Sequence, residues 1–96
     1  MQVLVADDER EIAELVELYL KNEGYAVTIC GDGLSAWEQI QQSAPDLAVL
    51  DVMMPRMDGF TLCRKIRERY TFPVIMLTAK VEDLDKIIGL SIGADD

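Results

Sequence analysis

The sequence predicts an α/β fold, a doubly wound parallel β-sheet with helices on both of its faces. Three observations predict it. Four short segments have the apolar or β-branched composition of buried strands. Each is followed by a stretch whose apolar residues recur at helical spacing, and the connections between them are short. Strands that alternate with helices in this way pair in parallel through right-handed crossovers.

The first predicted strand is the apolar run from Val3 to Ala6, which ends at acidic residues beginning with Asp7. Asp8 and Glu11, three residues apart, form a capping-box pattern that predicts the start of the first helix. This helix is expected to end at Gly24. Between these points, four apolar residues recur at helical spacing and are expected to face the core: Ile12, Leu15, Val16 and Tyr19.

The second strand is predicted over residues 25–30, and it ends in a Gly-Asp-Gly turn. A short helix over residues 34–43 follows the turn. It carries Trp37, which is expected to be a packing residue, and Ile40. Pro45 closes this segment, because proline cannot continue a helix.

The third strand is the apolar run from Leu47 to Leu50, and it ends at Asp51. Residues 53–59 form a loop shaped by proline and glycine, whose methionines Met53 and Met54 are expected at the loop and its rim. A third helix follows, with basic residues in its body and last turns. Its apolar positions are Leu62, Cys63, Ile66 and Tyr70.

The fourth strand is predicted over residues 73–77, and Thr78 follows it. A last amphipathic helix is marked by Leu84, Ile87 and Ile88. The element pattern is therefore βαβαβαβα. Residues 1–96 are expected to be a single domain that stops where a fifth strand should begin.

Charge and composition exclude several functions. Eighteen acidic residues against nine basic ones give a net charge of −9, which excludes a basic nucleic-acid-binding surface and disfavours an anionic membrane as partner. The chain has no histidine, and therefore no histidine-based catalysis and no histidine metal ligand. Cys30 and Cys63 have no metal-ligand spacing and are expected to be reduced and buried. Without a leader segment or a bilayer-spanning run, we expect a soluble, cytoplasmic protein.

Polar residues follow three of the predicted strands, at the sheet edge where ligands bind in open parallel sheets. Asp7 and Asp8 follow the first strand, Asp51 the third and Thr78 the fourth. The first and third strands are neighbours in this topology, so the three carboxylates should converge. Converging carboxylates resist ionisation unless a cation joins them, and Mg²⁺ prefers such oxygen ligands together with water and phosphate oxygens. The sequence therefore predicts a Mg²⁺ site that the protein coordinates only in part.

A carboxylate beside such a metal can attack phosphorus and form an aspartyl phosphate. The hydroxyl of Thr78 could then donate a hydrogen bond to the phosphoryl group. Each residue alone has an ordinary structural explanation, Asp8 as a helix cap and Asp51 as a turn residue. Their occurrence together at one sheet edge favours a site that accepts a phosphoryl group and holds it.

Five motifs, in order along the whole chain, resemble the receiver domain of two-component response regulators. They are Val5-Ala6-Asp7-Asp8-Glu9, the segment from Asp46 to Pro55, Met57-Asp58-Gly59, the segment from Pro73 to Ala79, and Gly93-Ala94-Asp95-Asp96. The last motif is similar to the winged-helix transcription-factor subclass, and residues 14–23 are similar to the glycopeptide-resistance regulators called VanR. The resemblance implies a flavodoxin-like receiver fold with strand order 2-1-3-4.

The resemblance also implies a role for each site residue. Asp51 is the implied phosphoacceptor, which takes a phosphoryl group from a sensor histidine kinase in a reaction that the receiver itself catalyses. Asp8 and Asp51 are the implied Mg²⁺ ligands, together with the backbone carbonyl of Met53, and Asp7 supports the metal through water. Thr78 is the implied switch hydroxyl. DNA would be bound by a separate output domain, which is absent from this chain.

The chain departs from the family after residues 93–96. There the family continues into a fifth strand, which ends in a lysine that contacts the phosphoryl group, and a fifth helix. Lys80 does not match the position of that lysine, so we expect slow phosphorylation. Without the fifth strand, the strand over residues 73–77 would be an unpaired apolar edge. We therefore expect the chain to self-associate, to swap elements or to be completed by another polypeptide.

Two other functions remain open at this point. A Mg²⁺-dependent phosphohydrolase would also use an aspartate nucleophile, but such enzymes place a second acid two residues later, where this chain has Met53. A non-phosphorylated interaction module would use the acidic residues as helix caps. It predicts no Mg²⁺ binding and no effect of Asp51→Asn on the response to ligand.

Overall fold

The computed structural model describes residues 1–77 of the 96-residue chain. Four strands and three helices alternate along these residues: β1 (Gln2–Ala6), α1 (Arg10–Asn22), β2 (Ala26–Cys30), α2 (Gly33–Gln42), β3 (Leu47–Asp51), α3 (Gly59–Arg69) and β4 (Val74–Leu77). Thr78 and the predicted last helix, with Leu84, Ile87 and Ile88, lie outside the described residues. None of the helices in residues 1–77 is long and apolar enough to cross a membrane.

The four strands form one parallel sheet in the order β2-β1-β3-β4. Val5 of β1 is paired with Ile29 of β2 on one side and with Val49 of β3 on the other. The predicted α/β fold and strand order are therefore confirmed. Within the described residues β4 is an outer strand, and the self-association expected through it stays a prediction.

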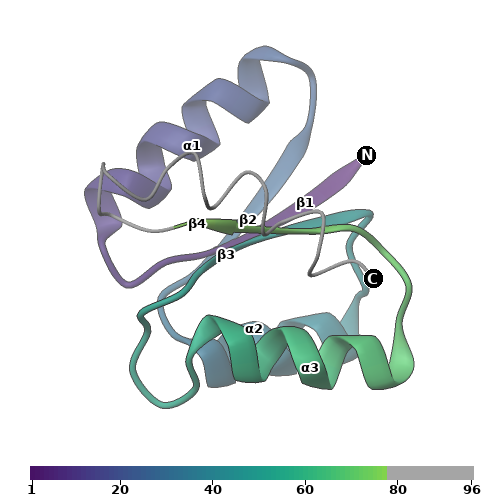
Figure 1. The fold of residues 1–96 in the computed structure, drawn as a ribbon. Helices are drawn as coiled ribbons and strands as arrows, with labels where there is room; N and C mark the ends of the chain where they lie inside the picture. Colours follow the sequence, from purple (N-terminus) through teal and green to yellow (C-terminus); the bar gives the residue numbers. More distant parts are fainter. Residues whose placement is uncertain (78–96) are drawn as a thin grey trace.

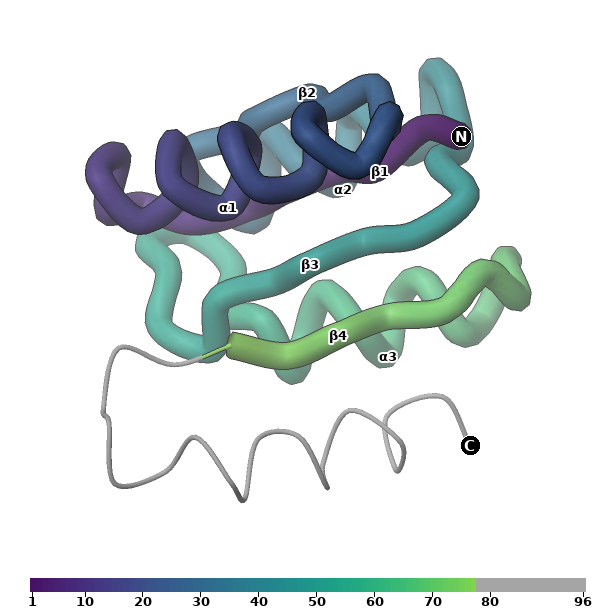
Figure 2. Tube along the Cα trace, turned by 90° about the horizontal axis from the view of Figure 1, so that it is seen from above, coloured from purple at the N-terminus to yellow at the C-terminus, as the bar shows by residue number. Residues whose placement is uncertain are grey.

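Helices cover both faces of the sheet, with α1 on one face and α2 and α3 on the other (Figure 1). Seen from above, α1 lies along β1 and β2 (Figure 2). Alternate strand residues therefore enter two separate cores. Leu4, Leu50 and Met76 belong to the larger core, on the side of α2 and α3. Val3 and Val5 belong to the smaller core beneath α1.

The packing face of α1 differs from the prediction. Ala13 is fully buried, and Val16 and Leu20 pack against the smaller core. Leu15 and Tyr19 are 63% and 74% exposed, so the expectation that they face the core is wrong. Apolar residues occur at helical spacing on two sides of this helix. Only its docking on the sheet selects the side that contains Ala13, the small residue that allows close approach to the strands.

The start of α1 also differs from the prediction. Its N-cap residue is Glu9, whose side chain makes no capping hydrogen bond, so the predicted capping box of Asp8 and Glu11 is wrong. The carboxylate of Asp7 instead accepts a hydrogen bond from the Glu9 N–H, at 2.8 Å. The acidic residues after β1 are thus not used as an ordinary helix cap.

The other two helices of residues 1–77 begin at aspartate caps. The Asp32 carboxylate accepts a hydrogen bond from the Ser35 N–H at 2.7 Å, at the start of α2. Asp58 does the same for the N–H of Thr61 at 2.9 Å, at the start of α3. These caps satisfy N–H groups that would otherwise lack a partner in the first turn of each helix.

Three further expectations concern packing. Trp37 is partly buried and meets the ring of Tyr70 edge-on, with 6.2 Å between the ring centroids, so its packing role is confirmed. Cys30 and Cys63 are buried and not in a disulfide, as expected. Met53 is exposed, but Met54 is buried in the larger core, so the prediction of a rim position for Met54 is wrong.

Candidate metal centre

Three carboxylates converge at the carboxyl edge of the sheet. β1 and β3 are neighbouring strands in which Ala6 is paired with Leu50, so the residues that follow this pair, Asp7 and Asp51, lie at the same edge. Asp8 comes next along the chain. One carboxylate oxygen from each of the three aspartates lies within 4.8 Å of the other two. The predicted convergence is confirmed, and its cause is the parallel register of β1 and β3.

Two of the three aspartates are buried and one is exposed. Asp7 and Asp51 are 4% and 6% exposed, respectively, whereas Asp8 is open to solvent. The N–H of Asp7 donates to the carbonyl oxygen of Cys30 at 3.0 Å, which holds Asp7 in line with β1. The site is therefore an acidic cluster with Asp8 on its solvent side.

Backbone groups hold the Asp51 carboxylate in place. The Met53 N–H lies 3.4 Å from Oδ1 of Asp51, a long hydrogen bond. At the next residue along the chain, the Val52 N–H donates to the carbonyl oxygen of Leu77 at 2.9 Å. The carbonyl oxygen of Val52 accepts from the Gly59 N–H, also at 2.9 Å. These bonds join the end of β3 to both β4 and α3.

Burial and like charge shift the pKa values of the two buried aspartates. Burial, with the nearby charge of Asp7, raises the pKa of Asp51 to about 7, against a weaker opposing effect of the Met53 N–H. Burial also raises the pKa of Asp7, which the Glu9 N–H opposes and the charge of Asp8 reinforces. A cation would offset the like charge that, after burial, contributes to both raised pKa values. The donor set, three carboxylates at one point, therefore fits a hard divalent cation such as Mg²⁺.

The remaining predicted site residues are placed as follows. Met53 lies beside Asp51 with its N–H toward the carboxylate, and its side chain is 72% exposed. Thr78 lies outside the described residues. The sequence predicted that Gly59 shapes the loop and that Gly33 belongs to the turn after the second strand, and it predicted no part for either in the site. The structure places Gly59 against the backbone of Asp51, and Gly33 against Met57.

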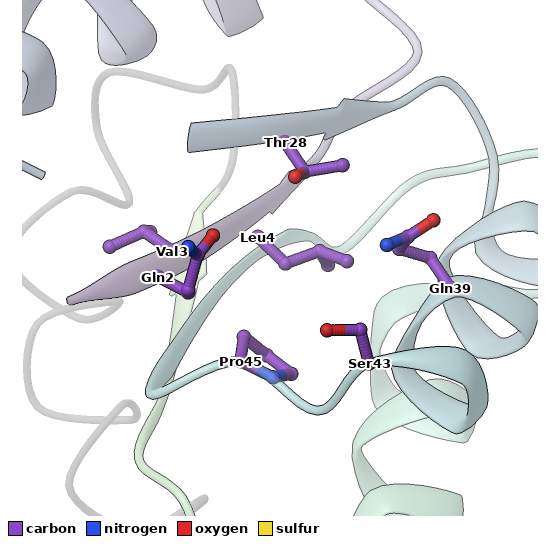
Figure 3. A pocket seen from close by; sticks show the side chains of 7 residues that line it. All are labelled: Gln2, Val3, Leu4, Thr28, Gln39, Ser43 and Pro45. Carbon is purple, nitrogen blue, oxygen red and sulfur yellow. The ribbon is translucent and has the colours of Figure 1, made fainter. Parts of the chain in front are cut away.

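A separate pocket lies at the opposite end of the sheet, where Thr28, Gln39 and Ser43 surround Leu4 (Figure 3). Its complete lining is Gln2, Val3, Leu4, Thr28, Gln39, Ser43 and Pro45. All of these side chains are uncharged, so the pocket lacks the carboxylates that the predicted Mg²⁺ site and aspartyl phosphate would need. The carboxylates that the sequence predicted to converge lie at the other end of the sheet, at the acidic edge.

Comparison with known proteins agrees with this geometry. The regulatory protein VanRc of Enterococcus gallinarum is 59% identical over 95 residues, and VanR of Enterococcus faecium is 55% identical over 95 residues. These matches cover 99% of this chain but only 41% of each relative, so the chain spans about two fifths of their length.

A solved structure, the response regulator TrrA of Thermotoga maritima in complex with Mg²⁺-BeF, is 32% identical with a TM-score of 0.82. The match covers 99% of this chain and 81% of that one. The family model for the response regulator receiver domain matches residues 3–96. An acidic triad such as Asp7, Asp8 and Asp51 is typical of a Mg²⁺-binding site in this family. The chain belongs to the response regulator receiver domain family.

Proposed function

We propose that this receiver domain accepts a phosphoryl group on Asp51 from a sensor histidine kinase, with Mg²⁺ as cofactor. The observation that carries the proposal is the convergence of carboxylate oxygens from Asp7, Asp8 and Asp51 within 4.8 Å. Asp51 is one of the two buried members, and it ends a central strand. Its burial fixes the position of its carboxylate, and it keeps away water that would compete for the phosphoryl group.

The transfer requires a deprotonated Asp51. An oxygen of its carboxylate attacks the phosphorus of a phosphohistidine, the P–N bond breaks, and the imidazole leaves with the bonding electrons and takes up a proton. The Met53 N–H, 3.4 Å from Oδ1, orients the carboxylate for this attack. Bound Mg²⁺ would neutralise charge on the transferred oxygens and lower the pKa of Asp51.

Each remaining residue has a proposed part. Asp8 and Asp51 hold the metal with the backbone carbonyl of Met53. Asp7 supports it through water, which agrees with the hydrogen bond that already engages its carboxylate with Glu9. Thr78 directly follows Leu77, the register partner of Asp51, and we assign its hydroxyl to the bound phosphoryl group.

The signal would pass to a DNA-binding output domain outside residues 1–96. Support comes from the two curated relatives, which are named regulatory proteins and are longer than this chain. The acidic receiver itself would not contact DNA, since its net charge is −9. The cytoplasmic location expected from the sequence stays a prediction.

The test is to incubate the chain with Mg²⁺ and acetyl phosphate and to measure its intact mass. Asp51→Asn removes the acceptor. Asp46→Asn is the matched control, because Asp46 is also an aspartate next to β3 but accepts its hydrogen bond from Gln2 at the other end of the strand. We expect one phosphoryl group on the wild-type chain and on Asp46→Asn, none on Asp51→Asn, and none in the presence of a chelator.

Other results would contradict the proposal. A phosphoryl group that persists in Asp51→Asn would place the acceptor at another residue. If neither the folded chain nor a chain extended through the family's fifth strand and fifth helix takes up a phosphoryl group, the non-phosphorylated interaction module is favoured. Steady turnover of a small phosphomonoester would favour the phosphohydrolase.

A further inference from the structure

The loop between β3 and α3, residues 52–58, carries Met53 and contains a strained turn. The Met57 N–H donates to the carbonyl oxygen of Pro55 at 2.8 Å, and Arg56 between them has a φ of 70°. A three-residue turn with positive φ is an unfavourable conformation for a residue other than glycine. Such a turn persists only where its surroundings hold it in place.

The tip of this loop rests on the first turn of α2. A Cβ added to Gly33 would lie 2.0 Å from the carbonyl oxygen of Met57 and 2.7 Å from its Cβ. Real Cβ atoms essentially never come within 3.0 Å of such neighbours, so any side chain at Gly33 would displace the loop or the helix. Met57 also packs against the larger core.

Opposite charges on Asp32 and Arg56 lie near this contact. The N–H of Ser35 and, more weakly, the positive charge of Arg56 hold the pKa of Asp32 below its ordinary value. Asp32 is the cap of α2 and directly precedes Gly33. The cap of α2 and the strained turn therefore attract each other beside the contact between Gly33 and Met57.

We propose that Gly33 is a positioning residue of the acidic site: by lacking a side chain it seats the Met57 carbonyl on α2 and so holds the loop that places Met53 beside Asp51. The consequence for the metal rests on the proposed function, whereas the effect on the loop does not. The three atoms nearest to a Cβ added at Gly33 all belong to Met57, so Gly33 would act on the metal ligands through the backbone of the loop.

The hydrogen bonds of the loop show which residues would shift if Gly33 carried a methyl group. A methyl group at Gly33 needs the Met57 oxygen to move by about 1 Å, from 2.0 Å to at least 3.0 Å. The base of the loop is fixed, since the Val52 N–H and carbonyl are bonded to Leu77 and Gly59. The shift therefore falls on residues 53–57. It disturbs the bond between the Met53 N–H and Asp51, which is already 3.4 Å long.

The test compares Gly33→Ala with Gly31→Ala in the chain itself. Gly31 is the matched control, because a Cβ there meets nothing within 4 Å and its φ is not positive. Amide hydrogen exchange is measured over residues 52–58, and Mn²⁺ affinity is measured by the electron paramagnetic resonance signal of the free ion. We expect faster exchange over residues 52–58 and about tenfold weaker Mn²⁺ binding in Gly33→Ala only.

Exchange over residues 52–58 that is unchanged in a folded Gly33→Ala variant would overturn the inference, and so would unchanged Mn²⁺ affinity. If the wild-type chain binds no Mn²⁺, the proposed metal function fails, and hydrogen exchange alone decides the inference about Gly33. If Gly33→Ala does not fold, Asp32→Ser takes its place, because serine preserves the cap and removes the charge facing Arg56. Faster loop exchange in that variant supports the inference and unchanged exchange overturns it.

Discussion

Gly59 lies directly against the backbone carbonyl of Asp51, and a Cβ on Gly59 would come within 2.3 Å of that oxygen. The same Cβ would also lie 2.9 Å from the terminal methyl group of Met76. The first residue of α3 is thus pressed against the end of β3. The position of the proposed phosphoacceptor therefore depends on a glycine that begins the next helix.

Gly59→Ala is expected to destabilise the domain by about 2 kcal/mol, because the added methyl group overpacks a site bounded by backbone. Gly31→Ala, where the methyl group enters open space, is expected to change the free energy of unfolding by no more than about 0.5 kcal/mol. Urea unfolding followed by circular dichroism measures both. Equal midpoints for the two variants would show that α3 can shift away from Asp51 at no cost.

The metal-free domain is expected to lose stability as the pH rises from about 3.8 to about 7. The pKa of Asp51 is about 7 in the folded chain against 3.8 for the ordinary value, so the folded state holds this proton more tightly. Its stabilising contribution is complete below pH 3.8 and is lost as the pH rises through about 7.

Asp51→Asn is neutral at every pH and should remove this dependence. In a chelating buffer near pH 8 we expect Asp51→Asn to exceed the wild type in free energy of unfolding by on the order of 2 kcal/mol, a difference that shrinks toward pH 5. Denaturant titrations at several pH values measure the difference. A gap that widens at lower pH would have the wrong sign for a raised pKa.

Mg²⁺ is expected to raise the thermal stability of the wild-type domain. At a concentration ten times the dissociation constant, the gain is about 1.4 kcal/mol. Asp8→Asn should reduce the gain, while Asp46→Asn, remote from the site, should keep it. Thermal unfolding with Mg²⁺, compared with a chelator at matched ionic strength, tests this. A full Mg²⁺ response in Asp8→Asn would remove Asp8 from the ligand set.

The two sides of α1 are expected to respond differently to substitution. Tyr19→Gln should change the free energy of unfolding by no more than about 0.5 kcal/mol, since Tyr19 is 74% exposed. Ala13→Leu should cost about 2 kcal/mol, because Ala13 is fully buried against the sheet. A larger loss from Tyr19→Gln than from Ala13→Leu would restore the packing face that the sequence pattern suggested.

The acidic site could be predicted from the sequence because it depends only on the order of the elements and on the residues that follow the strands. Apolar strands that alternate with helices require parallel pairing, and parallel strands end at one edge. Asp7, Asp8 and Asp51 follow such strands, so their convergence needs no knowledge of side-chain packing. The motifs that resemble the receiver family specified the strand order, and the parallel sheet with order β2-β1-β3-β4 agrees with it.

Other features were decided only by the tertiary structure. The sequence of α1 offers two apolar sides, and docking on the sheet selects Ala13 over Tyr19. A capping box is a local pattern, yet Asp7 bonds the Glu9 N–H because β1 directs it there. Gly33 and Gly59 are needed where a backbone from another part of the chain comes too close for a Cβ. Local periodicity determines elements and their order, whereas contacts between distant segments exist only once those elements have packed.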